Sequence, residues 1–326
     1  MKFYKNKKVL VTGASGFIGT NLIKKLLDRR AKVTGVIYNK SPQIKFKKVK
    51  YIKADLTKRQ NCLKVANNID YIFMCAANSS GANVMEKKPL THLTPNIVMN
   101  AYMLEAAYYN KIKKFCFISS NTVYPLLKRP VRENDVNYKF FTKYHIVGWM
   151  KLFSEEMCKM YNFNIKNPME TIIVRPGNLY GPYDKYTKNE SKVIAALIRR
   201  IYEKEKPLKV WGDGKDLKDF IYIDDFIEGL LKVFSIKNFS GPINLASGKS
   251  NTIRKIVKVL KKISNQKNLK VEYDDKMPSM IPYRLISKDK AKKLFKFKPK
   301  TNLHLGLKKT YYWYKKFYKN NTPEDY

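Results

Sequence analysis

The sequence predicts an α/β protein built on a doubly wound parallel sheet, with a smaller substrate-binding domain towards the C-terminus. Three observations support this prediction. Short apolar runs alternate with segments of helical periodicity, a glycine cluster separates the first run from the first helix, and the alternation breaks down after Pro176. Strands that alternate with helices form right-handed βαβ units, which place helices on both faces of a parallel sheet. The length of 326 residues allows two domains of unequal size.

The predicted elements follow one another as βαβ units require. Segment 71–77 is almost wholly apolar, as a central parallel strand buried on both faces should be. Apolar residues at helical spacing predict long helices over 96–109 and 147–161. Further strands are predicted at 9–11, 32–38, 49–52, 115–120 and 171–174, a first helix at 21–27, and a return of the chain to this domain over 224–234 and 243–246.

After Pro176 the loops lengthen and the elements shorten. Pro182, Pro207, Gly212 and Gly214 interrupt this part of the chain. We therefore assign residues to two domains: a dinucleotide-binding domain of 1–177 with 218–249, and a substrate-binding domain of 178–217 with 250–326.

The composition excludes several classes of protein. No apolar stretch approaches the roughly 20 residues that span a bilayer, and no signal-type apolar segment precedes the first strand. We therefore expect a cytoplasmic protein that does not bind membranes. The formal net charge is +40, but lysine is spread along the whole chain and no basic motif alternates with aromatic residues. We interpret the charge as a solvated surface that attracts anionic substrates, not as a nucleic-acid interface.

The cysteines and histidines do not form a metal-binding pattern. Four cysteines lack C-x-x-C pairing and three of them lie in apolar patterns, which favours buried thiols over disulfides. Only three histidines occur in the chain. We therefore expect no metal.

The glycine cluster lies between the strand at 9–11 and the helix at 21–27. Gly13, Gly16 and Gly19 form the pattern G-x-x-G-x-x-G. A tight strand-to-helix turn directs backbone N–H groups and the positive end of the helix dipole at a diphosphate. The sequence thus predicts a dinucleotide-binding turn. Gly13 would make the turn, Gly16 would admit the phosphates, and Gly19 would let helix and strand pack closely.

The end of the second predicted strand does not decide whether the cofactor is NAD or NADP. An Asp there would bind the adenosine ribose of NAD, and an Arg would bind the extra phosphate of NADP. Tyr38, Asn39 and Lys40 supply neither. After the third strand, Asp55 lies in a strand-to-helix loop from which it could reach an adenine amine.

Motifs along nearly the full length resemble those of one enzyme family. They lie at 12–19, 54–56, 76–77, 96, 119–120 with 124, 175–182, 210–214, 219–225 and 310–314. With them the chain resembles the extended short-chain dehydrogenase/reductases of the NAD-dependent epimerase/dehydratase family. Within it, the chain is similar to the GDP-L-fucose synthases and to related GDP-hexose or GDP-heptose dehydrogenases and epimerases. The resemblance implies a Rossmann domain, a nicotinamide cofactor over a nucleoside-diphosphate sugar, and hydride transfer at a ring carbon, most often carbon 4.

The resemblance also implies the cofactor and its binding residues. NAD is expected because similar enzymes keep a tightly held cofactor through a reaction cycle, and NADP stays open. The implied cofactor-binding residues are Gly13, Ser15, Gly16, Phe17, Ile18, Gly19, Asp55, Leu56, Ala76, Ala77, Asn96, Ser119 and Lys151.

The family's catalytic helix carries Tyr-x-x-x-Lys, whose spacing places both side chains on one face. The Lys binds the nicotinamide ribose and lowers the Tyr pKa, and the Tyr takes the hydroxyl proton as hydride leaves. A Ser or Thr at the preceding strand end binds the same oxygen. Ser120, four residues before Tyr124, matches that Ser.

Two registrations of the catalytic helix compete. One keeps Tyr144 and places Gly148 at the lysine, and the other keeps Lys151 and places Val147 at the tyrosine. Cys158 falls where the GDP-L-fucose synthases have a like residue if the second registration holds, so we favour the second. The usual general base is then absent.

A replacement for that base is expected near the start of the helix. Tyr144 would lie two turns before Lys151 on the same face, about 10 Å away by helical rise. His145 is its neighbour. The hypothesis is that Tyr144, His145 or an ordered water relays the proton, so the predicted catalytic residues are Ser120, Lys151 and Tyr144.

Differences from the family's motifs reduce the number of reactions that the chain is expected to catalyse. Asn121 and Thr122 follow Ser120 where dehydratases of the family carry Asp-Glu, so dehydration is not expected. Thr122 and Lys192 match the Cys and His with which the GDP-L-fucose synthases epimerise. Neither a Thr nor an ordinary charged Lys removes a proton beside a carbonyl well, although a desolvated Lys can. Simple oxidation or reduction is the expected reaction.

The resemblance places the nucleotide and diphosphate of the substrate beside one further set of residues. Cationic side chains near two phosphates form charge-assisted hydrogen bonds, so a basic pocket is also expected on physical grounds. The implied substrate-binding residues are Asn178, Lys192, Val193, Leu197, Arg200, Trp211, Lys218 and Arg284.

These inferences predict an NAD(P)-dependent oxidoreductase acting at carbon 4 of a GDP-linked hexose or heptose in surface polysaccharide synthesis. Carbon-4 epimerisation is the enzymatic alternative. A protein that only binds cofactor and sugar nucleotide is the alternative that Val147 suggests. By analogy of fold, the helices at 96–109 and 147–161 resemble the pair through which the family forms four-helix-bundle dimers, so a homodimer or a dimer of dimers is expected.

Overall fold

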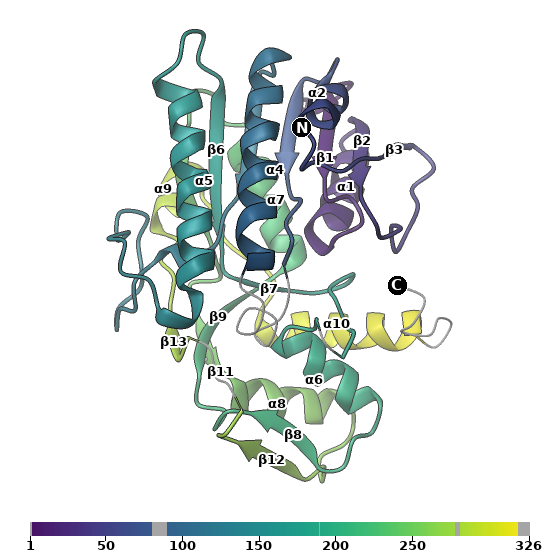
Figure 1. The fold of residues 1–326 in the computed structure, drawn as a ribbon. Helices are drawn as coiled ribbons and strands as arrows, with labels where there is room; N and C mark the ends of the chain where they lie inside the picture. The colour runs from purple at the N-terminus through teal and green to yellow at the C-terminus, as the bar shows by residue number, and fades with distance from the viewer. Residues whose placement is uncertain (1, 80–89, 189, 278–280, 319–326) are drawn as a thin grey trace.

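A computed structural model of the chain describes residues 2–79, 90–188, 190–277 and 281–318 (Figure 1). Its main feature is a seven-stranded sheet in the order β10-β6-β5-β4-β1-β2-β3, with every neighbouring pair parallel. The strand order reverses between β1 and β4, where doubly wound folds bind their ligands. This confirms the predicted fold class. The strands are β1 (Lys8–Thr12), β2 (Lys32–Ile37), β3 (Val49–Lys53), β4 (Tyr71–Met74), β5 (Lys114–Ile118), β6 (Glu170–Pro176) and β10 (Gly241–Leu245).

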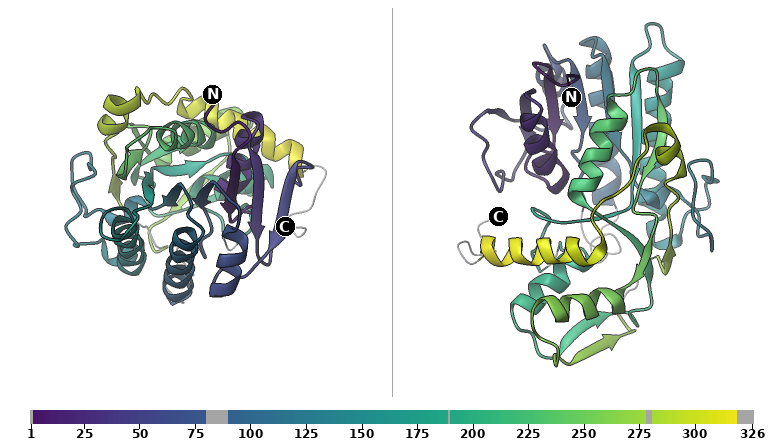
Figure 2. Two further views of the ribbon diagram at one scale, coloured as in Figure 1. Left: turned by 90° about the horizontal axis from the view of Figure 1, so that it is seen from above. Right: turned by 180° about the vertical axis from the view of Figure 1, so that it is seen from behind.

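Two helical layers enclose this sheet (Figure 2, left). One face packs on α2 (Arg59–Ala66), α4 (Leu90–Tyr109) and α5 (His145–Phe163), and the other on α1 (Phe17–Asp28), α7 (Ile223–Phe234) and α9 (Asp289–Phe295). The helices predicted at 21–27, 96–109 and 147–161 are confirmed, and the corresponding helices extend beyond those bounds.

The side chains of β1 explain why the central strands are continuous apolar runs. Val9 and Val11 pack in the core beneath α1 and α7, whereas Leu10 between them packs in the core beneath α2 and α4. Both faces of the strand are therefore buried, as expected of a parallel sheet. Cys62, Cys116 and Cys158 are buried free thiols in these cores, in agreement with the pattern in the sequence.

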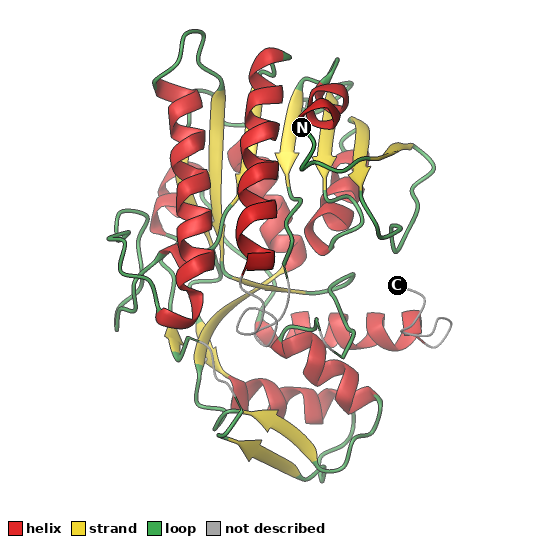
Figure 3. Ribbon diagram, viewed as in Figure 1, coloured by secondary structure: helices red, strands yellow, loops and turns green. Residues whose placement is uncertain are grey.

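The second part of the chain hangs below the carboxyl ends of the large sheet (Figure 3). A small sheet is centred on β9 (Leu217–Tyr222), which pairs with β7 (Asn178–Tyr180), β11 (Ser250–Thr252) and β13 (Tyr283–Arg284). The proposed domain boundary at 218 falls inside β9. The remaining elements are β8 (Leu208–Trp211) paired with β12 (Val271–Asp274), α6 (Val193–Tyr202), α8 (Ile253–Ile263) and α10 (Leu303–Tyr318).

The chain passes between the two parts several times. It leaves the large sheet after β6, returns through α7 and β10, and leaves again at β11. Within the described residues, no helix has the combined length and apolar character needed to cross a membrane.

Candidate active site

The glycine turn after β1 packs directly on the loop after β4. Gly13 has a φ of +65°, and a Cβ there would lie 2.8 Å from the Ala76 Cα. A Cβ on Gly19 would lie 2.2 Å from the Gly13 carbonyl oxygen. Thr12 joins the two loops, because its Oγ1 accepts hydrogen bonds from the backbone N–H groups of Cys75 and Ala76. This geometry agrees with the turn and close-packing roles predicted for Gly13 and Gly19.

The start of α1 fits the diphosphate of a dinucleotide. Gly16 is the N-cap and supplies no side-chain hydrogen bond, and the first turn contains no acidic residue. The N–H groups of Phe17, Ile18 and Gly19 have no intrahelical acceptor, because the first helical bond runs from Thr20 N to Gly16 O. These N–H groups and the helix dipole form an anion site, which a pyridine dinucleotide would fill.

The loops after β3 and β4 flank this turn. Asp55 Oδ1 accepts hydrogen bonds of 2.9 and 2.7 Å from Thr57 N and Oγ1, which hold the pKa of the carboxyl below its ordinary value. Asp55 is therefore ionised at the carboxyl end of β3. The buried Asn96 amide pairs with the backbone of Asn78, donating at 3.0 Å and accepting at 2.8 Å. Asn96 thus positions the loop that contains Ala76 and Ala77.

Ser119 directly follows β5, and its hydroxyl is directed into the protein. Its Oγ donates to Glu155 Oε1, and Arg175 completes the cluster with bonds of 2.9 and 2.5 Å to the Glu155 carboxylate. Glu155 and Arg175 are both almost wholly buried. Neither residue of this ion pair was among the predicted site residues, although an acidic residue on the apolar face of the predicted helix at 147–161 is a signal for a buried ion pair.

Ser120 is the N-cap of a short 3₁₀ turn, η1 (Asn121–Val123). Its Oγ accepts hydrogen bonds of 3.1 Å from Thr122 N and 2.9 Å from Thr122 Oγ1. A hydroxyl has two acceptor positions and one proton to donate. Since both acceptor positions are filled, the Ser120 hydroxyl proton is left to donate to a further acceptor.

Lys151 reaches the same strand end from α5. Its Nζ donates to the Ile118 carbonyl at 2.8 Å and lies 4.8 Å from the centre of the Phe117 ring. Burial lowers the pKa of Lys151 to about 8, although the nearby Glu155 carboxylate acts in the opposite direction. Gly148, the alternative lysine position, faces Phe140 and Thr122, and a Cβ there would lie 2.7 Å from the Phe140 ring.

Tyr144 does not share a helical face with Lys151, so that expectation is wrong. Tyr144 ends the 3₁₀ turn η2 (Thr142–Tyr144), its ψ of 9° is non-helical, and α5 begins only at His145. Burial raises the pKa of Tyr144 to about 12, although the Arg284 charge lowers it. Tyr144 is therefore a protonated phenol at neutral pH. The exposed His145 packs edge-on against Phe140, with its ring centre 5.9 Å away.

Three of the predicted substrate residues lie around β9. Arg284 and Lys218 are register partners on neighbouring strands, and Asn178 on β7 donates to the Asp219 carbonyl at 2.9 Å. The Arg284 guanidinium is buried and donates to the carbonyls of Pro125 and Tyr124, and its Nε has no hydrogen-bond partner among the residues that the structure describes.

Within the described part of the chain, no carboxylate forms an ion pair with Arg284. Burial lowers its pKa to about 10. In contrast, Lys218 lies 3.0 Å from Asp216.

The other predicted substrate residues are more dispersed. Lys192 precedes α6 with its Nζ 5.9 Å from the centre of the Phe17 ring, beside the glycine turn. Arg200, near the other end of α6, forms a bidentate ion pair with Glu205. The side chains of Leu197, Val193 and Trp211 are respectively buried, half-buried and exposed.

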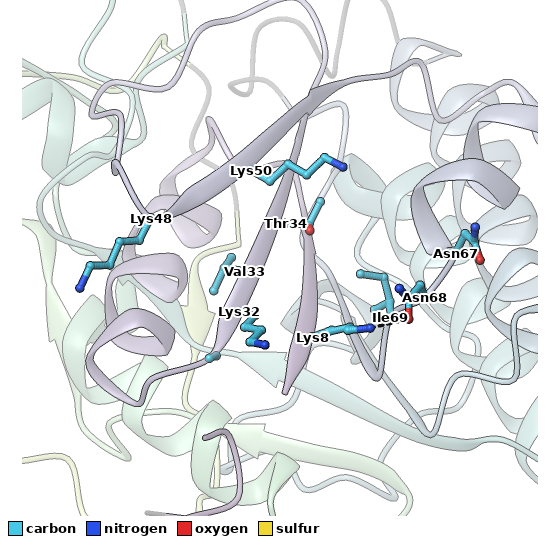
Figure 4. Close-up of a pocket in the computed structure, with 10 residues that line it drawn as sticks. Lys8, Lys32, Val33, Thr34, Lys48, Lys50, Asn67, Asn68 and Ile69 are labelled. Carbon is cyan, nitrogen blue, oxygen red and sulfur yellow. Dashed lines mark hydrogen bonds between the residues drawn. The ribbon is translucent and has the colours of Figure 1, made fainter. Parts of the chain in front are cut away.

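A separate hollow of about 530 Å³ lies at the amino ends of β1, β2 and β3 (Figure 4). Lys8, Lys32, Lys48 and Lys50 line it, and Lys8 Nζ donates to Asn68 Oδ1 at 2.5 Å. No predicted site residue lines this hollow. The candidate active site is at the opposite, carboxyl edge of the sheet, where doubly wound folds bind ligands.

The fold, the glycine turn and the buried lysine together define an enzyme that works with a pyridine dinucleotide. The model of the NAD dependent epimerase/dehydratase family matches residues 9–246. The chain therefore belongs to the NAD-dependent epimerase/dehydratase family, and its cofactor is NAD.

Relatives in sequence include two plant enzymes from Arabidopsis thaliana. GDP-mannose 3,5-epimerase is 27% identical over 95% of this chain and 82% of its own length. GDP-L-fucose synthase 1 is 26% identical over 96% of this chain and 94% of its own length.

Among solved structures, the UDP-glucuronic acid 4-epimerase of Bacillus cereus, in complex with UDP-glucuronic acid and NAD, has a TM-score of 0.84 at 27% identity. That match covers 95% of this chain and 100% of the other. The UDP-glucose 4-epimerase of Thermotoga maritima has a TM-score of 0.85 at 24% identity, covers 94% of this chain and 98% of the other, and supports the fold.

Proposed function

We propose that the protein modifies nucleotide sugars, and that it oxidises or reduces carbon 4 of a GDP-linked hexose or heptose for surface polysaccharide synthesis. The observation that carries the proposal is that Lys151 and Ser120 both lie at the carboxyl end of β5. A buried amine and a hydroxyl with a free proton lie there, two strands from the glycine turn. NAD, when bound, supplies the hydride acceptor, and NADH supplies the donor.

The residues of the chain divide the remaining work. Lys151 binds the nicotinamide ribose, and the Ser120 hydroxyl donates a hydrogen bond to the reacting oxygen of the sugar. The Val147 side chain has no exchangeable proton, so Tyr144 and His145, at the N-terminal end of α5, carry out the proton transfer. In the direction of reduction, the protonated Tyr144 phenol gives its proton to the developing alkoxide, which is a much stronger base than a phenolate. Water or His145 returns the proton.

The diphosphate of the sugar nucleotide would bind along β9. Among the described residues, the buried Arg284 has no carboxylate partner and its Nε is unpaired, so an anion would supply the missing counter-charge. Lys218 and Asn178 lie beside it. Guanine is proposed as the base because the GDP-sugar enzymes match this chain over almost its whole length.

Epimerisation next to a carbonyl has weaker support. The Thr122 hydroxyl donates to Ser120, and the Lys192 amine faces the Phe17 ring. Carbon-4 epimerisation is the second candidate, because it needs the same residues as oxidation and because the UDP-glucuronic acid 4-epimerase is similar in structure. Binding without turnover is the third, because Val147 replaces the usual tyrosine.

We also propose that the protein is a homodimer through α4 and α5. Trp149, Phe153, Met160 and Phe163 recur at helical spacing along α5 and are 42–65% exposed, and Tyr109 at the end of α4 is 60% exposed. A stripe of this kind is typical of a covered helix face. Light scattering should give the mass of two chains, or four if dimers pair, and Phe153→Glu should give one.

The function is tested with purified protein, NAD or NADH, and a panel of GDP- and UDP-sugars. A change at the reduced-nicotinamide absorbance band that depends on one sugar nucleotide supports an oxidoreductase. A new epimer without net change in NADH identifies an epimerase. Binding of both ligands with neither product leaves the non-catalytic binder, and failure to bind any sugar nucleotide rejects the proposal.

A further inference from the structure

The residues that follow β2 do not carry the charge expected for binding NAD. In dinucleotide folds, an acidic residue at this position favours the ribose hydroxyls of NAD, and a cation favours the 2′-phosphate of NADP. Here Tyr38, Asn39 and Lys40 follow the strand, so the local sequence offers a cation and no acid. The family nevertheless uses NAD.

The structure brings an acidic residue to this position from elsewhere in the chain. Glu190, which lies between β7 and α6 and 150 positions after Lys40, places its Oε2 3.0 Å from the Lys40 Nζ. Its Oε1 lies 3.5 Å from the Nζ of Lys185. Burial disfavours the charged carboxylate, yet these two ammonium groups hold the pKa of Glu190 below its ordinary value. Glu190 is therefore ionised between two lysines.

The segment that carries Glu190 is fixed across the carboxyl ends of three strands. Asn21 of α1 donates to the Pro182 carbonyl at 3.0 Å, and Gln43 of the β2–β3 loop donates to the Tyr183 carbonyl at 3.3 Å. Lys185 donates to the Ser79 carbonyl, in the loop after β4, at 2.9 Å. Figure 1 shows the β2–β3 loop reaching down towards this segment.

The outer side of the segment rests on α10. The Tyr183 ring packs on Trp313 with ring centres 4.9 Å apart, and Tyr186 packs on Tyr314 at 4.6 Å. The segment is thus held from both sides. These contacts keep the Glu190 carboxylate close to the end of β2.

We propose that Glu190 is the residue that selects NAD over NADP. Its carboxylate forms an ion pair with Lys40, the cation that would otherwise bind the 2′-phosphate of NADP. The negative charge of the carboxylate also repels that phosphate directly. The acidic residue that other dinucleotide folds carry at the end of β2 is replaced here by one from the segment after β7. This inference needs only the family's use of NAD and does not depend on which sugar is the substrate.

The proposal makes opposite predictions for two single variants. Glu190→Gln removes one negative charge and frees Lys40, so the ratio of the Kd for NADPH to the Kd for NADH should fall about tenfold, the size expected for one partly exposed charge near a phosphate. Lys40→Gln removes one of the two ammonium groups beside the Glu190 carboxylate and leaves only Lys185, so the ratio should rise. Both effects should shrink as salt is added.

The measurement is equilibrium binding of NADH and NADPH, followed by nicotinamide fluorescence, to the full chain without sugar nucleotide. Glu203→Gln is the matched control, because Glu203 pairs with Arg199 on α6 and no hydrogen bond ties it to the end of β2; it should leave the ratio unchanged. Two results would overturn the proposal: an unchanged ratio in Glu190→Gln, including equal weakening of both cofactors, or a shift in the same direction in Lys40→Gln. If Glu190→Gln does not fold, Lys40→Gln still tests the proposed role of the Glu190 carboxylate in cofactor selection.

Discussion

Replacing Lys151 by methionine should stabilise the cofactor-free protein at neutral pH. The fall in its pKa from 10.5 to about 8 corresponds to about 3 kcal/mol against the charged amine in the folded state. Methionine removes this penalty but leaves the Ile118 carbonyl without its hydrogen bond, a loss of about 1–2 kcal/mol. The free energy of unfolding at pH 7 should therefore rise by about 1–2 kcal/mol.

The pH dependence makes this prediction specific. A lysine whose folded pKa is depressed carries its penalty below about pH 8, and the penalty fades as pH rises from there towards 10.5, because the unfolded state then binds more protons than the folded state. Between about pH 7 and pH 9.5 the wild type should regain about 2 kcal/mol relative to Lys151→Met. The advantage of the variant should then vanish or reverse.

Urea unfolding of both proteins at the two pH values measures this difference. Lys159→Met on the same helix is the matched control, since Lys159 is partly exposed and paired with Glu156; its effect should not change with pH in this way. A Lys151→Met protein that is less stable at pH 7, or a stability difference that is independent of pH, would refute the assignment of Lys151 as a buried, desolvated amine. The gain in stability should accompany loss of turnover, as is common at active sites.

Four further substitutions test the site. Ser120→Ala should lower kcat by about 10²-fold without changing the Kd for NADH, because the hydroxyl contacts the sugar oxygen and not the cofactor; weaker NADH binding would place it elsewhere. Arg284→Lys should raise the Kd for the sugar nucleotide by about tenfold in calorimetry, since an ammonium cannot donate in the guanidinium's fork geometry, and an unchanged Kd would remove Arg284 from the diphosphate site. Tyr144→Phe should slow reduction in stopped-flow traces; if both it and His145→Ala turn over normally, the proton passes through neither residue.

The fold could be predicted because its signals are local. A strand buried on both faces must be apolar at every position, and the run at 71–74 shows this directly. The glycine turn is equally visible, because the positive φ of Gly13 and the 2.2 Å that a Cβ on Gly19 would leave permit no side chain. Each of these steric requirements concerns a single residue, so it can be recognised from the identity of that residue alone.

The site was predicted less completely because its contacts are distant in sequence. The pairing of Glu190 with Lys40 spans 150 positions, and the buried pair of Arg175 with Glu155 joins a strand to the helix before it. The start of α5 was also missed, because Tyr144 is an N-cap without a capping side chain. The favoured residues for that position, Ser, Thr, Asp and Asn, would have marked the boundary.

Equilibrium dialysis of NAD against wild type and Gly16→Asp measures whether the diphosphate of NAD binds at the start of α1. Gly16 has the extended backbone of an N-cap, where Asp is favoured, and a Cβ there would lie 3.2 Å from the Gly13 carbonyl oxygen, so the variant should fold with a small loss of melting temperature. Its carboxylate would occupy the anion site, so the affinity for NAD should fall at least about 100-fold, or about 3 kcal/mol. Equal binding of NAD by the variant, or no binding by the folded wild type, would contradict the account.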